Sequence, residues 1–344
     1  MKNKTTGIRV QPKQAEKMCK YLSEKKVLRS DLKISKDDKF IYLPLKDIPN
    51  EIDSHNIVRM EFEKRETKPK SYKEIVMISN KLKNELPTSY DVIGDIILIK
   101  LPNNLLKYQK EIGRALLKSN KNIRTVCLIE PVTGEFRTRN ITVIAGEKRT
   151  TTIHKEYGLK LDVDVKNTYF SPRLATERKR VAELVEPGET IVDLFTGVAP
   201  FSIMIAKYAD PKIIYAIDKN EEAIKCTKQN IKRNNVLDKI EAINADAREV
   251  SNILQKKADR IIMNLPFSAH LFFAYALKIA KNHTIIHYYD ILKDNKILER
   301  IDKLKKIAEE NRYALTNLDA RKIKTYAPRE FYIGIDITAK KMPM

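Results

Sequence analysis

The stretch from Thr190 to Phe201, T-I-V-D-L-F-T-G-V-A-P-F, most constrains what this 344-residue chain can fold into. Its apolar start ends on Asp193, Gly197 offers a turn, and an amphipathic segment continues to Tyr208. We therefore predict a strand, a tight turn and a helix, in that order. A second apolar run, I-I-Y-A-I-D, ends on Asp218. An acid at the tip of the second strand of a doubly wound sheet is where the ribose hydroxyls of a nucleotide-like cofactor bind.

Two more strand-like runs follow along the chain. Ile240 to Asn244 leads to a third acid, Asp246, and Arg260 to Met263 runs directly into the tetrapeptide N-L-P-F, Asn264 to Phe267. All four runs end in polar residues, at the positions where the ligand crevice of an open parallel sheet lies. A single glycine does not make the G-x-G-x-x-G fingerprint, so we expect no pyrophosphate cradle, and taken alone the glycine is equally compatible with an ordinary turn.

From residue 159 onward, strand and helix periodicities alternate. This alternation predicts an α/β domain in which right-handed crossovers place helices on both faces of a mostly parallel, seven-stranded sheet. The last three strands are expected at Thr284 to Tyr289, Leu315 to Thr325 and Phe331 to Thr338. The domain resembles the class I S-adenosylmethionine-dependent methyltransferases, which have a Rossmann-like fold. N-L-P-F is similar to their N-[PL]-P-[YF] motif, which acts on a planar nitrogen of a base.

Charge and cysteine content narrow the class of protein. With 66 Lys and Arg against 45 Asp and Glu, the net charge is +21, which favours a polyanionic partner, although a generally lysine-rich chain is the alternative. Cys19, Cys127 and Cys226 lack the spacing of a disulfide framework or zinc site, and the five histidines are scattered, so we expect no metal. No apolar run approaches the ~20 residues of a membrane span. We expect a cytoplasmic protein without a membrane segment.

Composition and turn residues divide the chain into a small α/β N-terminal domain over residues 1–65, a middle α+β module over 66–158, and the α/β domain over 159–344. The charged run from Glu61 to Lys73 is typical of a linker. In the middle module we expect one helix over Tyr72 to Leu86 and one strand over Val92 to Leu101.

A longer series of motifs carries a more specific resemblance. In chain order the motifs include G-E-F-R-T-R (Gly134 to Arg139), T-I-H-K-E-Y-G (Thr152 to Gly158), Y-F-S-P-R-L-A-T-E-R (Tyr169 to Arg178), D-L-F-T-G-V-A-P-F, N-L-P-F and Y-A-P-R-E (Tyr326 to Glu330). Together they resemble the archaeal and eukaryotic tRNA (guanine, position 37, N-1) methyltransferases over nearly the whole chain, in the three-domain form of the archaeal members. The resemblance implies methyl transfer from S-adenosylmethionine to N-1 of guanine 37, next to the anticodon of tRNA.

The resemblance also implies how tRNA is bound. The target guanine is stacked in the anticodon loop, so it has to be flipped out to reach the site. The first domain would be a tether that recognises the outer body of tRNA by shape, and the middle module would contact RNA. Arg137, Arg139, Lys148 and Arg149 are candidates for phosphate or base contacts, although turn charges are often only solvated. No protein partner is implied, and we expect a monomer.

The reaction requires a base and a cation. N-1 of guanine carries a proton, which has to leave while negative charge spreads toward O-6, so the site needs a general base and a fixed donor. The family's T-E-R element implies that Glu177 is the base; the alternative is a first-turn helix carboxylate that only stabilises the helix. Arg137 is the candidate for the developing oxygen charge, with Arg139 as its rival and a solvated hairpin charge as the plainer interpretation.

Three residues are candidates for placing the target base. Asn264 can hold a base edge by hydrogen bonds, and Pro266 keeps the backbone fixed at the strand end, although an Asn–Pro turn is also common in ordinary loops. Tyr169 could stack on the base or could simply belong to the core.

The cofactor residues follow from the resemblance and the strand tips. Asp218 should bind the ribose hydroxyls, Asp246 the adenine amino group, and Phe195 to Gly197 the methionine end, with Arg178 at its carboxylate. The full predicted set for the cofactor is Arg178, Phe195, Gly197, Asp218, Lys219, Asp246, Ala247 and Asn264. Ala199 departs from the family, in which many members have Gly, and its methyl group is expected to narrow the approach of the cofactor.

Three alternatives stay open. A wybutosine-pathway aminocarboxypropyl transferase resembles this fold and uses the same cofactor, but it needs no base at N-1. A tRNA-binding protein with a degenerate cofactor site is suggested by Ala199 and the high charge. An adenine N-6 methyltransferase also uses N-[PL]-P-[YF], but Glu177 has no role there.

Overall fold

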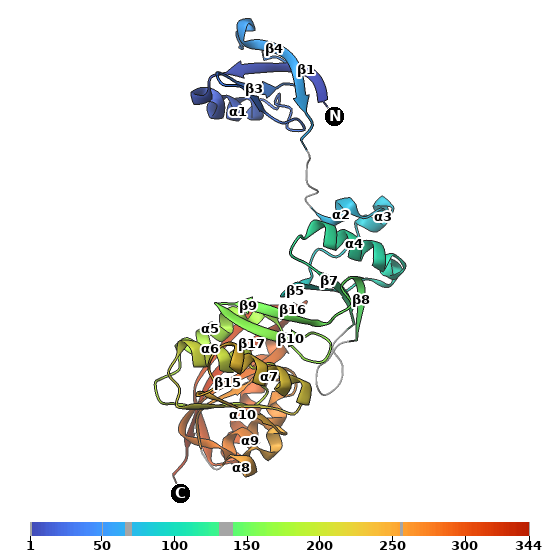
Figure 1. Cartoon of the computed structure of the whole chain (residues 1–344). Helices are drawn as coiled ribbons and strands as arrows, with labels where there is room; N and C mark the ends of the chain where they lie inside the picture. The colour runs from blue at the N-terminus through green and yellow to red at the C-terminus, as the bar shows by residue number, and fades with distance from the viewer. Residues whose placement is uncertain (1, 50, 66–70, 131–139, 255–256, 344) are drawn as a thin grey trace. The chain divides into compact units, whose positions relative to one another are not determined.

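The computed structural model describes residues 2–49, 51–65, 71–130, 140–254 and 257–343. The chain divides into two compact units, Met1–Glu74 and Ile75–Met344. Figure 1 shows the helices and strands of both units, coloured by residue number from blue at the N-terminus to red at the C-terminus. No helix in the described ranges is both long and apolar enough to cross a bilayer.

The first unit contains a four-stranded antiparallel sheet in the order β2-β3-β1-β4. Its elements are β1 (Lys2–Val10), α1 (Ala15–Glu24), β2 (Ser35–Lys36), β3 (Ile41–Pro44) and β4 (Ile57–Glu63). Helix α1 begins after a 3-10 turn opened by Pro12, as expected of a proline at a helix start. It buries Ala15 and Leu22 against Ile8 and Leu43 of the sheet, which forms the core of this unit.

The second unit begins with a four-stranded sheet in the order β5-β6-β7-β8 and the helices beside it in sequence, of which the first spans the unit boundary. These elements are α2 (Tyr72–Ile75), α3 (Asn80–Lys83), β5 (Asp91–Ile93), β6 (Ile96–Ile99), α4 (Gln109–Ser119), β7 (Thr125–Ile129) and β8 (Ile141–Gly146), with α2 starting just before the unit boundary. The single helix predicted over Tyr72 to Leu86 is wrong, because the backbone at Ser79 is extended and a new helix begins there.

The single strand predicted over Val92 to Leu101 is also wrong, because the chain turns back at Gly94 and Asp95 and forms a hairpin. Gly94 has φ +55, and a Cβ atom there would lie 2.1 Å from the Thr152 hydroxyl oxygen. The Asp95 carboxylate accepts hydrogen bonds from Arg149 and Thr152, which fixes the turn. The turn therefore depends on residues more than fifty positions away in sequence.

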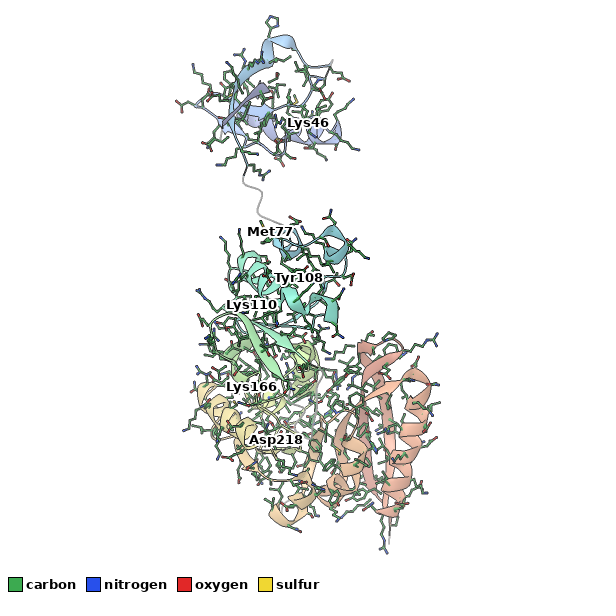
Figure 2. The ribbon with its side chains drawn as sticks, turned by 90° about the vertical axis from the view of Figure 1, so that its right-hand side faces the viewer. Lys46, Met77, Tyr108, Lys110, Lys166 and Asp218 are labelled. Atoms are coloured by element: carbon green, nitrogen blue, oxygen red, sulfur yellow. The ribbon has the colours of Figure 1, made fainter. Side chains whose placement is uncertain are left out.

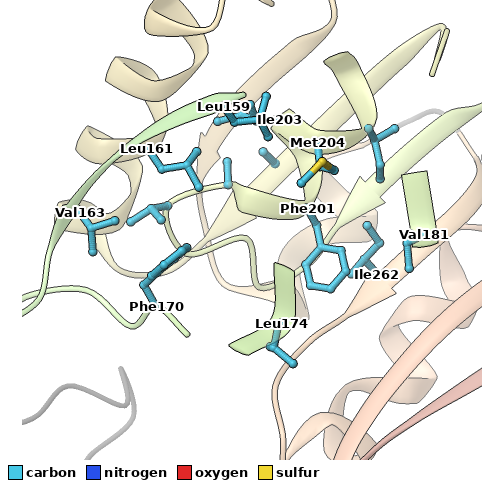
Figure 3. Packing of buried hydrophobic residues seen from close by; sticks show 14 of the residues in the cluster. Leu159, Leu161, Val163, Phe170, Leu174, Val181, Phe201, Ile203, Met204 and Ile262 are labelled. Atoms are coloured by element: carbon cyan, nitrogen blue, oxygen red, sulfur yellow. The ribbon is translucent and has the colours of Figure 1, made fainter. Parts of the chain in front are cut away.

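A two-stranded hairpin, β9 (Thr151–Glu156) and β10 (Leu159–Asp164), connects this module to the large sheet. The boundary predicted after residue 158 falls in the turn between these paired strands. Buried side chains of β6, β7 and β10 belong to the same apolar cluster as those of the following helices. Figure 3 shows part of this cluster, with Leu161 and Val163 of β10 and Phe201 and Met204 of the next domain.

The large sheet has seven strands in the order β13-β12-β11-β14-β15-β17-β16. The strands are β11 (Thr190–Asp193), β12 (Ile213–Asp218), β13 (Ile240–Asn244), β14 (Ala258–Met263), β15 (Ala280–Lys293), β16 (Tyr313–Ala327) and β17 (Glu330–Lys341). The first five in that spatial order run parallel, and β17 and β16 are antiparallel to their neighbours. The predicted class I methyltransferase fold, with a mostly parallel sheet, is confirmed.

Helices cover both faces of this sheet. The helices are α5 (Ala175–Glu183), α6 (Pro200–Tyr208), α7 (Glu221–Arg233), α8 (Val250–Ile253), α9 (Phe273–Lys278) and α10 (Ile297–Glu310). One face packs against α5, α6 and α7, and the other against α8, α9 and α10. Strands β15, β16 and β17 are longer than predicted, and their added length carries much of the chemistry described below.

Candidate functional site

A pocket opens at the carboxyl ends of the parallel strands. Its walls come from the start of α5, the loop after β11, the tips of β12 and β13, and the loop after β14. The lining residues are Tyr169, Phe170, Ser171, Leu174, Arg178, Leu194, Phe195, Thr196, Gly197, Pro200, Asp218, Lys219, Asp246, Ala247, Asn264, Leu265 and Phe272. Figure 2 labels Asp218 in this domain. Parallel strands all end at one edge of a sheet, which is why residues distant in sequence meet here.

The loop after β11 is fixed by hydrogen bonds from its neighbours. Gly197 has φ +58, and its amide donates to the Asp218 carboxylate at 2.7 Å. The Thr227 hydroxyl donates to the Gly197 carbonyl oxygen at 2.8 Å, and the Asn230 side chain donates to the next carbonyl. Helix α7 therefore holds the turn, and the predicted strand–turn–helix is confirmed.

Asp218 is placed as an acceptor at the tip of β12. Its carboxylate accepts hydrogen bonds from the backbone amides of Gly197 and Asn220, at 2.7 and 2.9 Å. Burial raises the pKa of Asp218, because the amides only partly offset the loss of solvent. Asp218 therefore lies at the strand tip, and its role as the ribose acceptor stays a prediction.

Asp246 has a different environment from Asp218. It caps the following turn and accepts hydrogen bonds from the Arg248 guanidinium at 2.9 and 2.6 Å, and the Lys219 ammonium lies 3.3 Å away. The Arg248 hydrogen bonds lower its pKa, although partial burial opposes the shift. Lys219 and Ala247, both predicted for the cofactor, line the pocket beside it.

Asp193 at the end of β11 is a buried acid that the site prediction did not include. Burial raises its pKa to about 6, although the hydroxyl groups of Ser202 and Thr196 donate to it at 2.8 Å and oppose this shift. Its repulsion with Asp218 raises the pKa further. The sequence signal was the D-L-F-T-G motif itself, in which the acid precedes the turn.

Arg178 lines the pocket, but its guanidinium is paired within the protein. The Glu156 carboxylate of β9 accepts from its Nε at 2.7 Å and from its Nη2, and the Ser171 carbonyl oxygen accepts from both Nη atoms. Phe170 covers the guanidinium, whose carbon lies 5.2 Å from the ring centroid. Arg178 thus links the hairpin to the pocket wall, and its charge is already balanced by Glu156.

The N-L-P-F loop is held from two strands. The Tyr332 hydroxyl of β17 donates to Oδ1 of Asn264, and the Asp290 carboxylate of β15 accepts from the Phe267 amide at 2.9 Å. Asn264 lines the pocket, and Pro266 is buried. Phe267 has φ +72, a left-handed conformation that costs an aromatic residue energy, so the loop is held by its contacts.

Glu177 lies in the first turn of α5, buried between the helix and the sheet. Its Oε1 atom accepts from Arg180, Tyr289 and Arg321 at 2.8 to 2.9 Å. Its Oε2 atom accepts from Arg180 Nε at 3.0 Å. Burial alone would raise its pKa, but these hydrogen bonds lower it. Glu177 is absent from the described pocket lining, although Leu174 and Arg178 of the same segment belong to it.

The Glu177 cluster continues along the same face of the sheet. Asp336 of β17 binds Arg180 and Arg321, and its other partner is His287 Nδ1 at 2.6 Å. Arg260 Nη1 lies 2.8 Å from His287 Nε2. Because a guanidinium can only donate, Nε2 accepts and Nδ1 carries the proton, so His287 is neutral. Burial lowers the pKa of His287 accordingly.

The remaining predicted residues divide in two groups. Tyr169 and Phe195 line the pocket, and the Phe195 ring packs edge-on against Phe272 at 5.1 Å. Arg137 and Arg139 lie outside the described residues. Among the described residues, no group of three His, Cys, Asp or Glu side chains is placed to hold a metal ion.

Ala199 is in the left-handed region, with φ 61 and ψ 38, at the start of α6. It is fully buried in the apolar cluster of that face and lies outside the described pocket lining. The cost of having Ala instead of Gly is therefore one of backbone strain, about 1–2 kcal/mol for a residue with a Cβ atom.

Comparison with known protein families gives matches to three successive parts of the chain. Residues 152–316 match the TRM5/TYW2 methyltransferase domain, residues 72–150 the TYW2 N-terminal domain, and residues 7–53 the tRNA methyltransferase 5 N-terminal domain. The tRNA (guanine(37)-N(1))-methyltransferase Trm5b of Pyrococcus abyssi is 39% identical over 334 residues, covering 96% of this chain and 98% of that protein. A tRNA(Phe) (4-demethylwyosine(37)-C(7)) aminocarboxypropyltransferase of Methanocaldococcus jannaschii is 37% identical, but covers 72% of this chain.

Solved structures of both kinds of relative are also similar to this chain. The crystal structure of Trm5b from Pyrococcus abyssi has a TM-score of 0.81 at 38% identity and covers 98% of this chain and 99% of its own. A complex of aTrm5 with tRNALeu also has a TM-score of 0.81, at 36% identity, covering 96% and 99%. TYW2 of Methanocaldococcus jannaschii in complex with AdoMet has a TM-score of 0.58 at 30% identity, covering 74% and 100%.

Proposed function

This chain belongs to the tRNA (guanine(37)-N(1))-methyltransferase family, and we propose that it transfers a methyl group from S-adenosylmethionine to N-1 of guanine 37 of tRNA. The observation that carries this function is similarity over the whole chain, including a tRNA methyltransferase 5 N-terminal domain at residues 7–53. The aminocarboxypropyl transferase relatives match about three quarters of the chain.

The pocket suits S-adenosylmethionine by its donor and acceptor set. Asp218 offers carboxylate lone pairs at the strand tip, Gly197 keeps the turn beside it, and the Phe195 and Phe272 rings, packed edge-on, provide an apolar wall. Asp193 and Asp218 are held by hydroxyl and amide donors, so their negative charge favours a cationic ligand. When bound, the cofactor supplies the methyl group on its sulfonium, and the protein contributes placement and charge.

Glu177 would take the proton from N-1 of guanine. Its Oε2 atom accepts one side-chain group, Arg180, among the described residues, so a lone pair remains for a proton. The arginines lower its pKa, so the carboxylate is ionised at neutral pH and is a weak base. A weak base completes the transfer only as the methyl group arrives, which couples proton loss to methylation.

The developing charge on guanine O-6 needs a donor. Asn264 lines the pocket with its amide, and Arg137 supplies the cation in our proposal on the strength of the family motif. Tyr169 in the pocket wall would bound the flipped base, and Pro266 would keep the Asn264 backbone in place. We further propose that residues 1–65 recognise the outer body of tRNA and that residues 66–158 contact RNA near the anticodon loop.

The experiment is incubation of unmodified tRNA transcripts with labelled S-adenosylmethionine, followed by nucleoside mass analysis. Label in the methyl group should appear in 1-methylguanosine at position 37, and a transcript with adenine at that position should give no such product. Transfer of label from the carboxyl carbon instead would establish aminocarboxypropyl transfer. Absence of cofactor binding by calorimetry, with tRNA binding intact, would establish an RNA-binding protein without this activity.

A further inference from the structure

We propose that Tyr332 is the residue that makes the site select a purine with oxygen at C-6, because it fixes which end of the Asn264 amide faces the pocket. The inference rests on the proposed function and adds a specificity-determining role for a residue of β17. Tyr332 acts through Asn264, so it is a positioning residue. Tyr332 belongs to none of the motifs that carry the family resemblance, so the sequence alone did not indicate this role.

The Tyr332 ring is held tightly. Its side chain is 1% exposed, and its backbone pairs with Ile291 of β15. The Tyr289 ring packs beside it with centroids 6.2 Å apart, and the Lys324 ammonium lies 5.0 Å from the ring centroid. The hydroxyl donates to Asn264 Oδ1. A ring this buried has little freedom, so its hydroxyl is a fixed reference point for the amide.

The Asn264 backbone is fixed from the neighbouring strand. The fully buried Asp290 carboxylate accepts from the Phe267 amide at 2.9 Å, and the Tyr288 hydroxyl donates to the same carboxylate at 2.7 Å. Pro266 lies between the two anchored residues and restricts the chain further. With backbone and ring both fixed, the Asn264 amide retains one choice, which is the direction of its oxygen and its NH₂ group.

Tyr332 makes that choice. An asparagine amide carries an acceptor oxygen at one end and two N–H donors at the other. A tyrosine hydroxyl can donate or accept, and in this structure it donates to the amide oxygen, so the NH₂ group is the end of this pocket-lining side chain that Tyr332 leaves available. Guanine presents an acceptor oxygen at C-6, whereas adenine presents a donor amino group there. The fixed amide therefore stabilises the guanine edge and leaves an adenine amino group facing another donor.

The arrangement also favours the reaction itself. Negative charge spreads toward O-6 as N-1 loses its proton, and a donor already aimed at that oxygen needs no reorganisation. In the Tyr332→Phe variant the ring remains but the hydroxyl is lost. The amide can then turn and offer its oxygen to an adenine amino group, so discrimination falls with the rate on guanine.

The test measures single-turnover methylation of transcripts with guanine, hypoxanthine or adenine at position 37, by wild type and Tyr332→Phe with saturating S-adenosylmethionine. We expect the variant to slow guanine and hypoxanthine equally, by about 10-fold, since both keep the C-6 oxygen and one hydrogen bond to a reacting group is lost. Adenine-37 transcripts should gain detectable methyladenosine. Cofactor affinity is measured by calorimetry alongside, because Asn264 lines the pocket, and a loss of affinity alone would not slow the reaction at saturating S-adenosylmethionine.

The matched control is Tyr313→Phe. Tyr313 is also buried, and its hydroxyl donates to the Ala280 carbonyl oxygen at 2.9 Å in the core on the opposite face of the sheet. This variant removes the same atom and should keep wild-type rates on all three transcripts. The double variant Tyr332→Phe with Asn264→Ala should be no slower than Asn264→Ala alone, because the hydroxyl acts through the amide.

The inference is overturned if Tyr332→Phe methylates guanine 37 as fast as wild type, or if adenine-37 transcripts gain no product. It is also overturned if the double variant is slower than Asn264→Ala alone, so that the two losses of rate add. These outcomes concern variants of an active protein. Failure of the wild-type protein to methylate guanine 37 would instead overturn the proposed function, so the two are distinguishable.

Discussion

In the half of the sheet formed by β11, β12 and β13, Asp193 and Asp218 are held by hydroxyl groups and backbone amides, and burial raises the pKa of both. At the half formed by β15, β17 and β16, Asp336 of β17 and Glu177 of the packed helix α5 are held mainly by guanidinium groups. Their pKa values are lowered, although burial opposes the shift. Apart from Asp246, which Arg248 and Lys219 balance, the first half leaves negative charge for a cationic ligand. The second half balances its charges internally and uses them to fix side chains.

The largest effect expected from this comparison is on turnover. Glu177→Gln removes the proton acceptor and should slow methyl transfer by about 10²–10⁴-fold, the usual contribution of a general base, with cofactor affinity unchanged. Single-turnover kinetics measure the rate of methyl transfer, and calorimetry measures the cofactor affinity. Glu189→Gln is the control, because Glu189 pairs with buried Arg260 at 2.7 Å at the far end of the same face. Equal slowing of both variants would make Glu177 a structural acid.

Opposite pKa shifts should give opposite stability profiles. A carboxyl group whose pKa is raised to about 6 from the ordinary 3.8 destabilises the folded state as pH rises between these values. For Asp193 this amounts to about 3 kcal/mol, from a pKa difference of about two at about 1.4 kcal/mol each. Glu177 and Asp336, with lowered pKa values, stabilise the folded state above pH 4 and lose that stabilisation in acid.

Denaturant unfolding at several pH values measures this difference. Asp193→Asn should flatten the stability loss between pH 4 and pH 7, while Asp336→Asn should flatten the loss below pH 4. If Asp193→Asn leaves the upper slope intact, the acid of the first half is not the unbalanced charge we describe.

The charge left in the first half should also be visible in binding. Asp218→Asn should weaken binding of cationic S-adenosylmethionine by about 10–100-fold, the range of a hydrogen bond to a charged group. It should weaken neutral S-adenosylhomocysteine less, because only the hydrogen bonds are then lost. Calorimetry with both ligands decides this, and Asp336→Asn should change neither affinity. Equal weakening of both ligands would argue against a charge effect.

A smaller effect is expected from a substitution that only crowds the side chains of the second half, the one formed by β15, β17 and β16. Gly334 lies in β17, and a Cβ atom there would be 3.1 Å from the Tyr289 ring and 3.3 Å from Arg321 Nη2. Both groups hold Glu177, so Gly334→Ala should shift them and slow turnover several-fold, with overpacking costing about 1–3 kcal/mol. Cofactor affinity serves as the internal control. An unchanged rate in a destabilised variant would show that Glu177 tolerates movement of its donors.

The smallest effect is expected at Ala199. Ala199→Gly relieves about 1–2 kcal/mol of left-handed strain but loses a buried methyl group and adds chain entropy, so stability should change by less than about 1 kcal/mol. Ala206→Gly in the last turn of α6 has no strain to relieve and should cost more, since Ala206 is also buried and is helical. Equal losses at both positions, measured by denaturant unfolding, would mean that the left-handed turn is unstrained.

The cofactor half could be predicted because its signals are local. An apolar run, an acid and a glycine specify a strand and its turn, and parallel strands bring their ends together without further information. Gly197, Asp218, Asp246 and Asn264 therefore meet in one pocket as expected. The errors at Tyr72–Leu86 and Val92–Leu101 arose where a contact distant in sequence or an extended residue interrupts a regular pattern.

The sequence by itself determined the fold class, the family and the edge of the sheet where the pocket opens, since these depend on periodicity and on motifs that lie within a few residues. The tertiary structure alone decided what surrounds Glu177 and Asn264. Their partners Tyr289, Arg321 and Tyr332 come from antiparallel strands whose order and irregular register follow no local pattern. A buried charge or amide is defined by what is packed against it, and packing between distant segments exists only once the chain has folded.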